Sequence, residues 1–243
     1  MTPDAGLVER IAERAAALRG RIAERTDRDV RVVCVTKAHP PEVAAAALAA
    51  GFVDLGENYA QELRDKEAAL RDEEAALRDE EAALRDEEAA LHDRVGAAPR
   101  WHFIGRLQSN KVRTIAGVVD LWHTVDRASL AAEVAKRAPG ARVLVQLDLA
   151  GLPDRGGCDP AEAPALVAAC RDLGLAVEGL MGVGPPGDPE DARPGFRLLD
   201  ATAGELGLRE RSMGMSADLD VAVECGATIV RVGSALVGER PPR

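Results

Sequence analysis

The segment VRVVCVTK, residues 30–37, is a short apolar run that ends in a lysine. Its length and its β-branched residues are typical of a strand buried in a parallel sheet. Such a strand would place Lys37 at the mouth of an α/β fold. A lysine there is either charged and paired or loses its proton through desolvation, and a neutral amine can attack an aldehyde to form a Schiff base. The alternative is a solvated surface lysine just past a strand end.

Strand-like and helix-like segments alternate along the rest of the chain, after an opening helix expected at about residues 3–24. Strands are expected at residues 31–36, 53–55, 101–104, 119–122, 143–149, 177–181, 211–213 and 228–230. Helices between them are expected to begin near Pro41, Tyr59, Ser109, Arg127, Pro160, Glu190 and Ala217. Eight β/α units predict a single domain over residues 1–243, a closed (β/α)8 barrel of the TIM type. An open doubly wound sheet has a similar local pattern.

Two glycine-containing segments near the end of the chain resemble phosphate cradles. They are SMGMS at residues 212–216 and RVGSALVG at residues 231–238, with a short helix expected from Ser234. Glycine lets backbone N–H groups approach an anion, and serine adds a hydroxyl donor. Ordinary glycine turns would have the same pattern. In a closed barrel, however, Ser216, Gly233 and Ser234 follow strands seven and eight, where barrels commonly bind phosphate, and strand eight adjoins the Lys37 strand.

These positions together favour a phosphorylated aldehyde as the ligand. Arg231 ends strand eight near the same mouth and could face the ring nitrogen of pyridoxal phosphate. Its permanent charge would disfavour protonation of that nitrogen and weaken the cofactor as an electron sink.

A seven-residue unit, RDEEAAL with small variations, repeats between Leu63 and Leu91. The leucine spacing suggests a coiled coil, but on a helix the leucines are flanked by glutamates and no broad apolar stripe results. Pairs such as Glu67 with Arg71 are spaced i,i+4 in the favourable order. The repeat therefore predicts a long solvated helix over residues 59–94, pointing away from the site, with weak self-association as the alternative. A monomer is expected.

Composition limits the function classes. The net charge of −10 with scattered basic residues argues against a nucleic-acid partner. No stretch reaches the roughly 18 apolar residues of a membrane span, and the N-terminus has no apolar signal core. The four cysteines have no C-x-x-C spacing, which fits free thiols in a reducing cytoplasm. No metal site is implied.

The chain resembles the pyridoxal phosphate homeostasis proteins, single-domain relatives of the N-terminal barrel of alanine racemase. The resemblance covers nearly the whole chain, and its most specific motifs are GENY at residues 56–59 and WHFIGRLQSNK at residues 101–111. It implies that Lys37 carries pyridoxal 5'-phosphate (PLP) as an internal aldimine. It further implies that Ser216, Gly233 and Ser234 hold the phosphate, that Arg231 faces the pyridine nitrogen, and that Asn58, His102 and Met181 line the pocket.

Single residues have alternative readings. A strand histidine such as His102 or His123 is also often a hydrogen-bonded core residue. Trp101 and Trp122 are expected to fill space between strands and helices. If Lys37 faces the barrel interior, Cys34 points to the opposite face and is inert.

The resemblance favours a carrier of PLP without robust catalysis. Alanine racemase takes a second base, a tyrosine, from a further domain, and Tyr59, the only tyrosine here, does not match it. Candidate partners are PLP, other B6 vitamers, amino acids and PLP-dependent apo-enzymes. One alternative is a low-efficiency PLP-dependent racemase or lyase, and another is a scaffold that binds a partner through the charged helix.

Overall fold

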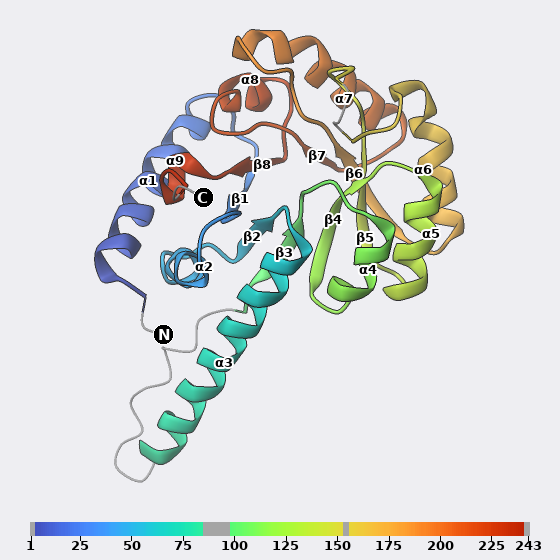
Figure 1. The fold of residues 1–243 in the computed structure, drawn as a ribbon. Coiled ribbons are helices and arrows are strands. Elements are labelled where there is room, and N and C mark those ends of the chain that lie inside the picture. Colours follow the sequence, from blue (N-terminus) through green and yellow to red (C-terminus); the bar gives the residue numbers. More distant parts are fainter. Residues whose placement is uncertain (1–2, 85–97, 153–155, 241–243) are drawn as a thin grey trace.

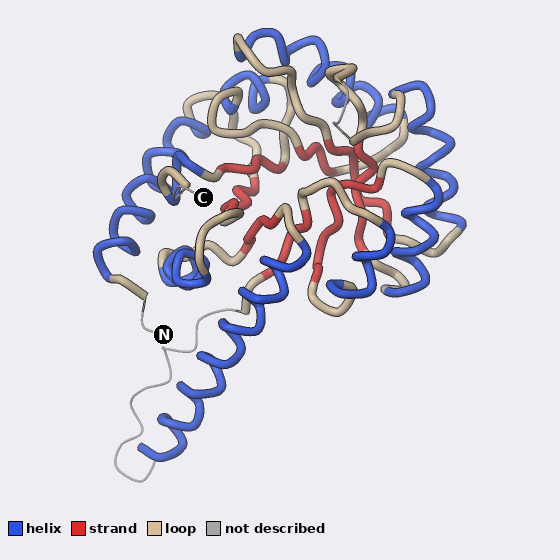
Figure 2. Tube along the Cα trace, in the orientation of Figure 1, coloured by secondary structure: helices blue, strands red, loops and turns tan. Residues whose placement is uncertain are grey.

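The computed structural model describes residues 3–84, 98–152 and 156–240. Within these ranges eight parallel strands pair in chain order and close into a barrel, because β8 pairs with β1 as well as with β7. Figure 2 shows the strands as an inner ring surrounded by helices. The predicted (β/α)8 fold is therefore confirmed. The strands are β1 (Arg31–Val35), β2 (Asp54–Glu57), β3 (Arg100–Phe103), β4 (Val119–Val125), β5 (Arg142–Gln146), β6 (Ala176–Met181), β7 (Glu210–Ser212) and β8 (Ile229–Val232).

A helix, or a 3-10 turn leading into one, lies at or close to each start that the sequence predicted (Figure 1). The opening helix α1 is capped by Asp4, whose carboxylate accepts from the Leu7 N–H at 2.7 Å. The helices are α1 (Ala5–Ala23), α2 (Pro41–Ala49), α3 (Ala60–Leu84), α4 (Ser109–Ile115), α5 (Ala128–Arg137), α6 (Ala163–Asp172), α7 (Arg193–Glu205), α8 (Leu219–Glu224) and α9 (Ser234–Val237), with 3-10 turns η1 (Pro160–Glu162) and η2 (Pro189–Ala192).

The core has two layers, because successive strand side chains point to opposite faces. The inner cluster contains Val33, Leu121, Leu144, Met181 and Ile229. The larger outer cluster, between strands and helices, contains Cys34, Trp101 and Trp122 among its buried residues. The expected orientation of Cys34 is thus confirmed, and burial raises the pKa of its thiol to about 12, which makes it unreactive.

Strand β5 is shorter than the sequence predicted. It ends at Gln146 rather than at residue 149. Beyond it Leu147 forms an isolated parallel bridge with Cys158, and the Asp148 N–H donates to the Cys158 carbonyl at 2.8 Å. This loop brings residues 146–149 to the barrel mouth.

Helix α3 contains the repeat as far as Leu84 and extends well beyond the barrel (Figure 1). Leu63 and Leu70 are buried where the helix lies on the barrel, and the predicted pair of Glu67 with Arg71 is present at 3.2 Å. The predicted continuation over residues 85–94 lies outside the described residues. No helix in the described part of the chain is both long and apolar enough to cross a membrane.

Candidate functional site

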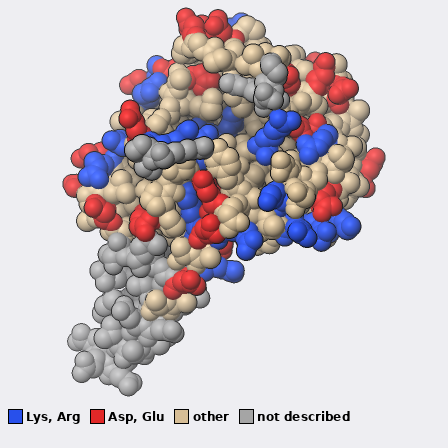
Figure 3. Space-filling view, in the orientation of Figure 1, with Lys and Arg blue, Asp and Glu red and all other residues tan. Residues whose placement is uncertain are grey.

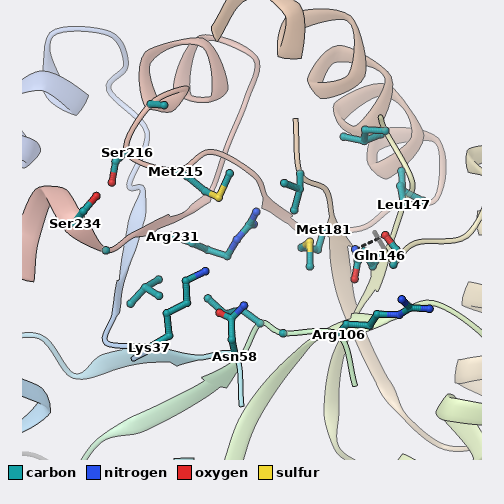
Figure 4. A pocket seen from close by; sticks show the side chains of 18 of the residues that line it. Lys37, Asn58, Arg106, Gln146, Leu147, Met181, Met215, Ser216, Arg231 and Ser234 are labelled. Carbon is teal, nitrogen blue, oxygen red and sulfur yellow. Dashed lines mark hydrogen bonds between the residues drawn. The ribbon is translucent and has the colours of Figure 1, made fainter. Parts of the chain in front are cut away.

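A cavity of about 530 Å³ opens at the carboxyl ends of the strands. Barrel closure places the loop after β1 beside the loop after β8, so residues from the first and the last β/α units line the same cavity. Figure 4 shows the arrangement of the side chains. Seven of the residues predicted from the sequence line the cavity: Lys37, Asn58, Met181, Ser216, Arg231, Gly233 and Ser234.

Lys37 lies two residues beyond β1, and its side chain extends into the cavity toward Arg231 (Figure 4). Its Nζ atom has no hydrogen bond or ion pair within the described residues. Burial, and then the positive charges of Arg240 and Arg231, lower the pKa of Lys37 against the opposing effect of Glu57. An amine with a lowered pKa is more often neutral and hence nucleophilic.

A buried ion pair anchors the backbone just before Lys37. Lys66, in α3, is 2% exposed, and its Nζ donates to Glu57 Oε1 at 2.5 Å and to the Thr36 carbonyl at 2.7 Å. The Thr36 hydroxyl donates to the same Glu57 oxygen at 2.6 Å. Burial raises the pKa of Glu57, whereas the charge of Lys66 opposes the rise. The turn after β1 is thereby tied to the helix after β2.

The backbone just after Lys37 is anchored to the same helix. Ala38 has a φ of 60°, a conformation that residues other than glycine adopt rarely. Its N–H donates to Glu62 Oε2 at 2.8 Å, and Glu62 lies 3.9 Å from Lys66 Nζ. Contacts on both sides thus fix the turn that carries Lys37.

The predicted phosphate cradle is assembled from the loops after β7 and β8. Figure 4 shows the hydroxyl oxygens of Ser216 and Ser234 facing each other at one end of the cavity. Gly233, next to Ser234 in the chain, lies against β1, where a Cβ would approach the Val35 carbonyl to 3.3 Å. Two hydroxyl donors and a backbone without a side chain make this end suitable for an anion.

Arg231 lies in the wall between the cradle and the barrel interior. Its Nη1 donates to Ser212 Oγ at 2.7 Å and its Nη2 to the Gly182 carbonyl at 2.9 Å. Burial lowers the pKa of Arg231 to about 10 against the opposing charge of Asp218. The guanidinium still carries its charge at neutral pH and has further N–H groups for a ligand.

Asn58 and Met181 lie on the remaining walls. Asn58 Oδ1 is buried without a hydrogen-bond partner, so it is an acceptor available to a ligand. A Cβ on Gly105 would lie 2.0 Å from the Asn58 carbonyl oxygen, so only glycine lets the loop after β3 pass this close. Met181 ends β6 and packs in the inner core below the cavity.

His102 does not line the cavity, contrary to the prediction from the sequence. It is 2% exposed, and both ring nitrogens are already bonded, Nδ1 to His123 at 2.8 Å and Nε2 to Asp54 at 2.9 Å. The core reading is the correct one for both histidines. Asp54 begins β2, so this pairing holds His102 toward the opposite end of the barrel.

Comparison with known proteins places the chain in a family. Residues 8–241 match the family model for the alanine racemase N-terminal domain. A pyridoxal phosphate homeostasis protein from Pseudomonas aeruginosa is 35% identical, covering 96% of each chain, and one from Aquifex aeolicus is 36% identical, covering 90% of each. This chain belongs to the pyridoxal phosphate homeostasis protein family.

Solved structures agree with this assignment to the homeostasis protein family. PipY from Synechococcus elongatus, solved with PLP bound, superposes with a TM-score of 0.73 at 32% identity, covering 94% of this chain and all of that one (100%). Without PLP its TM-score is 0.77 at 33% identity. An alanine racemase from Clostridium difficile shares the fold alone, with a TM-score of 0.64 at 17% identity over 93% of this chain and 56% of that one.

Several further residues of the site in this family member were not predicted from the sequence. Gln146, Asp148, Arg106 and Arg240 also line the cavity. A second cavity, of about 780 Å³, adjoins it and shares Asn58 and Arg106 with it. Lys and Arg side chains gather beside the hollow on the face drawn in Figure 3, over the part of the barrel covered by α4 and α5.

The buried role of Lys66 had a signal in the sequence. Later repeats have Glu73 and Glu80 at the position that Lys66 occupies in the first. A lysine that breaks an acidic repeat just where the helix meets the barrel is a candidate for a buried ion pair.

Proposed function

We propose that this protein binds PLP and acts in its intracellular homeostasis, holding the cofactor through a Schiff base with Lys37 and supplying it to apo-enzymes. The observation that carries the proposal is the amine of Lys37, which has a lowered pKa, no partner among the described residues, and a serine cradle in the same cavity. The names of the relatives and the PLP bound to PipY also support it.

The residues fit the cofactor group by group. Ser216, Gly233 and Ser234 would hold its phosphate, and Lys37 would bond its aldehyde carbon. Arg231 would donate to the pyridine nitrogen, while the unpartnered Oδ1 of Asn58 offers an acceptor on the wall nearby. When bound, PLP supplies an electrophilic aldehyde and an electron-withdrawing ring.

The wall of the cavity favours binding over turnover. An arginine facing the pyridine nitrogen keeps that nitrogen unprotonated and weakens the ring as an electron sink. Among the described lining residues the only carboxylate is Asp148, and its Oδ1 already accepts from the N–H groups of Ala150 and Gly151. No histidine, tyrosine or cysteine of the described chain lines this cavity, so we propose that robust catalysis is absent.

The proposal includes a cytoplasmic monomer. The four cysteines, all buried and free, fit a reducing compartment. Free PLP is the proposed ligand, and other B6 vitamers that keep the phosphate would use the same cradle. Amino acids remain candidate ligands of a racemase-like activity.

Retention of PLP by the purified protein tests the proposed function. Wild type is expected to retain PLP through gel filtration with a long-wavelength absorbance band, and Lys37→Ala is expected to lose the band. Lys136→Ala is the matched control, since Lys136 lines neither this cavity nor the adjoining one and its loss should leave binding unchanged. An unchanged absorbance band in Lys37→Ala, or no PLP retained by wild type, would refute the proposal.

A second measurement separates the carrier from the low-efficiency racemase or lyase. The PLP-loaded protein is incubated with alanine in deuterium oxide, and exchange of the α-proton is followed by NMR. Exchange no faster than with free PLP is expected of a carrier. Exchange that depends on Lys37 would favour the enzyme.

A further inference from the structure

A chain of buried hydrogen bonds crosses the barrel interior beneath the cavity. Arg231 Nη1 donates to Ser212 Oγ at 2.7 Å, and Ser212 Oγ lies 2.9 Å from His123 Nδ1. His123 Nε2 lies 2.8 Å from His102 Nδ1, and His102 Nε2 lies 2.9 Å from Asp54 Oδ1. All five side chains are buried. The guanidinium at the cavity is thus connected to a carboxylate at the amino end of β2.

The chemistry of the groups sets the direction of these bonds. A guanidinium only donates, so Ser212 Oγ accepts from Arg231 and its own proton is free to go to His123 Nδ1. A neutral imidazole has one donor and one acceptor, so His123 then donates from Nε2 to His102. His102 in turn donates from its Nε2 to Asp54. With both histidines neutral, this direction satisfies every bond of the chain.

The opposite direction is unfavourable. Ser212 Oγ would then accept from both neighbours, and its proton would be left without an acceptor in a fully buried position. Burial above all keeps the pKa of His123 well below its ordinary value. Burial opposes ionisation of Asp54, but hydrogen bonds from His102 and Arg100 outweigh it and lower its pKa to about 2.

Arg231 needs such a chain because it has no ion pair within the described residues. A buried charge without a counter-ion is costly unless hydrogen-bonded groups compensate it. Here the carboxylate of Asp54 polarises the imidazole and hydroxyl groups of the chain. The Ser212 oxygen that accepts from the guanidinium thereby gains partial negative charge. The Gly182 carbonyl fixes the second guanidinium nitrogen, Nη2, at 2.9 Å, which leaves the remaining N–H groups for the cavity.

We propose that Ser212, His123 and His102, anchored by Asp54, are positioning residues that hold and compensate the guanidinium of Arg231 at the ligand cavity. The direction of the hydrogen bonds is a property of the protein without cofactor. Only the expected effects on the absorbance band and the affinity of bound PLP rest on the proposed function.

The tautomers of the histidines test the chain directly. The sequence contains four histidines, so their ring nitrogens can be resolved by ¹⁵N NMR of the cofactor-free protein. Two neutral rings protonated at Nε2 are expected at neutral pH. Protonation at Nδ1, or a doubly protonated ring at neutral pH, would overturn the proposal.

Substitutions test the effect on the ligand. Ser212→Ala removes only the hydroxyl, and we expect it to release the fixed tautomer of His123, shift the absorbance band of bound PLP and weaken PLP binding roughly tenfold. Arg100→Ala is the control, because it removes an exposed partner of Asp54 but keeps the carboxylate. It should leave the tautomers, the band and the affinity unchanged.

The outcomes are distinguishable. Wild-type tautomers, absorbance band and affinity in Ser212→Ala would refute the positioning role. If wild type itself fails to bind PLP, the proposed function fails, while the NMR of the cofactor-free protein still decides the direction of the chain.

Discussion

Replacing Lys66 by methionine tests how the turn that carries Lys37 is held. Methionine keeps the length of the buried side chain and removes its charge. Glu57, which has no exposed surface, would then keep only the hydrogen bond from Thr36, since its Oε2 already has no partner. Removing one member of a buried ion pair costs about 3–5 kcal/mol of unfolding free energy. That is a large part of the 5–15 kcal/mol typical of a folded domain.

Urea unfolding followed by circular dichroism measures the loss, with the midpoint and slope reported for each variant. Arg71→Ala is the matched control on the same helix, because Arg71 pairs with Glu67 at 3.2 Å but its side chain is 75% exposed. Its expected cost is below about 1 kcal/mol. The double variant Glu57→Gln/Lys66→Met should recover most of the loss, since no uncompensated charge remains.

The Lys66→Met substitution should also affect the ligand site. Lys66 Nζ holds the Thr36 carbonyl at 2.7 Å, so its loss frees the backbone before Lys37 and should weaken PLP binding even where the protein is folded. A cost for Lys66→Met no larger than that of Arg71→Ala would show that this ion pair does not anchor the turn.

Three further predictions concern single positions. The folded pKa of Asp54, about 2, lies below its ordinary value of 3.8, so this group stabilises the protein above about pH 4. About 2 kcal/mol should be lost as pH falls to 2, a loss that calorimetry should find reduced in Asp54→Asn. Gly105→Ala should lower the urea midpoint and PLP affinity, because its Cβ would meet the Asn58 carbonyl at 2.0 Å, whereas Gly117→Ala, with no atom within 4 Å, should not. Equal effects would contradict that argument. Cys34 and the other three buried thiols should react with a thiol reagent only after unfolding in urea, and fast labelling of the native protein would show otherwise.

The barrel and the phosphate end of the site could be predicted because their signals are local. Glycine and hydroxyl residues follow two apolar segments, and strand order then determines that Ser216 and Gly233 meet Lys37. The error at His102 has a physical cause. Strand alternation indicates which face a side chain occupies, but the depth of its partners along the barrel axis depends on Asp54 and His123, which lie on other strands.

The role of Lys66 was missed for a different reason. Within a charged repeat every lysine or glutamate can be interpreted as a solvent-exposed side chain. Only the packing of α3 against the barrel buries Lys66. The cavity residue Asp148 was missed because the predicted strand ran through it to residue 149, whereas β5 ends at Gln146 and the residues after it line the cavity.

Peptide mapping after borohydride reduction tests the central claim most directly. The chain has four lysines, Lys37, Lys66, Lys111 and Lys136, and only Lys37 lines the cavity with the serine cradle. Borohydride would lock bound PLP onto whichever amine carries it, and mass spectrometry would locate the label. The account predicts a single pyridoxyl label on Lys37 at stoichiometric PLP. A label on Lys111 or Lys136 instead, or none, would contradict it.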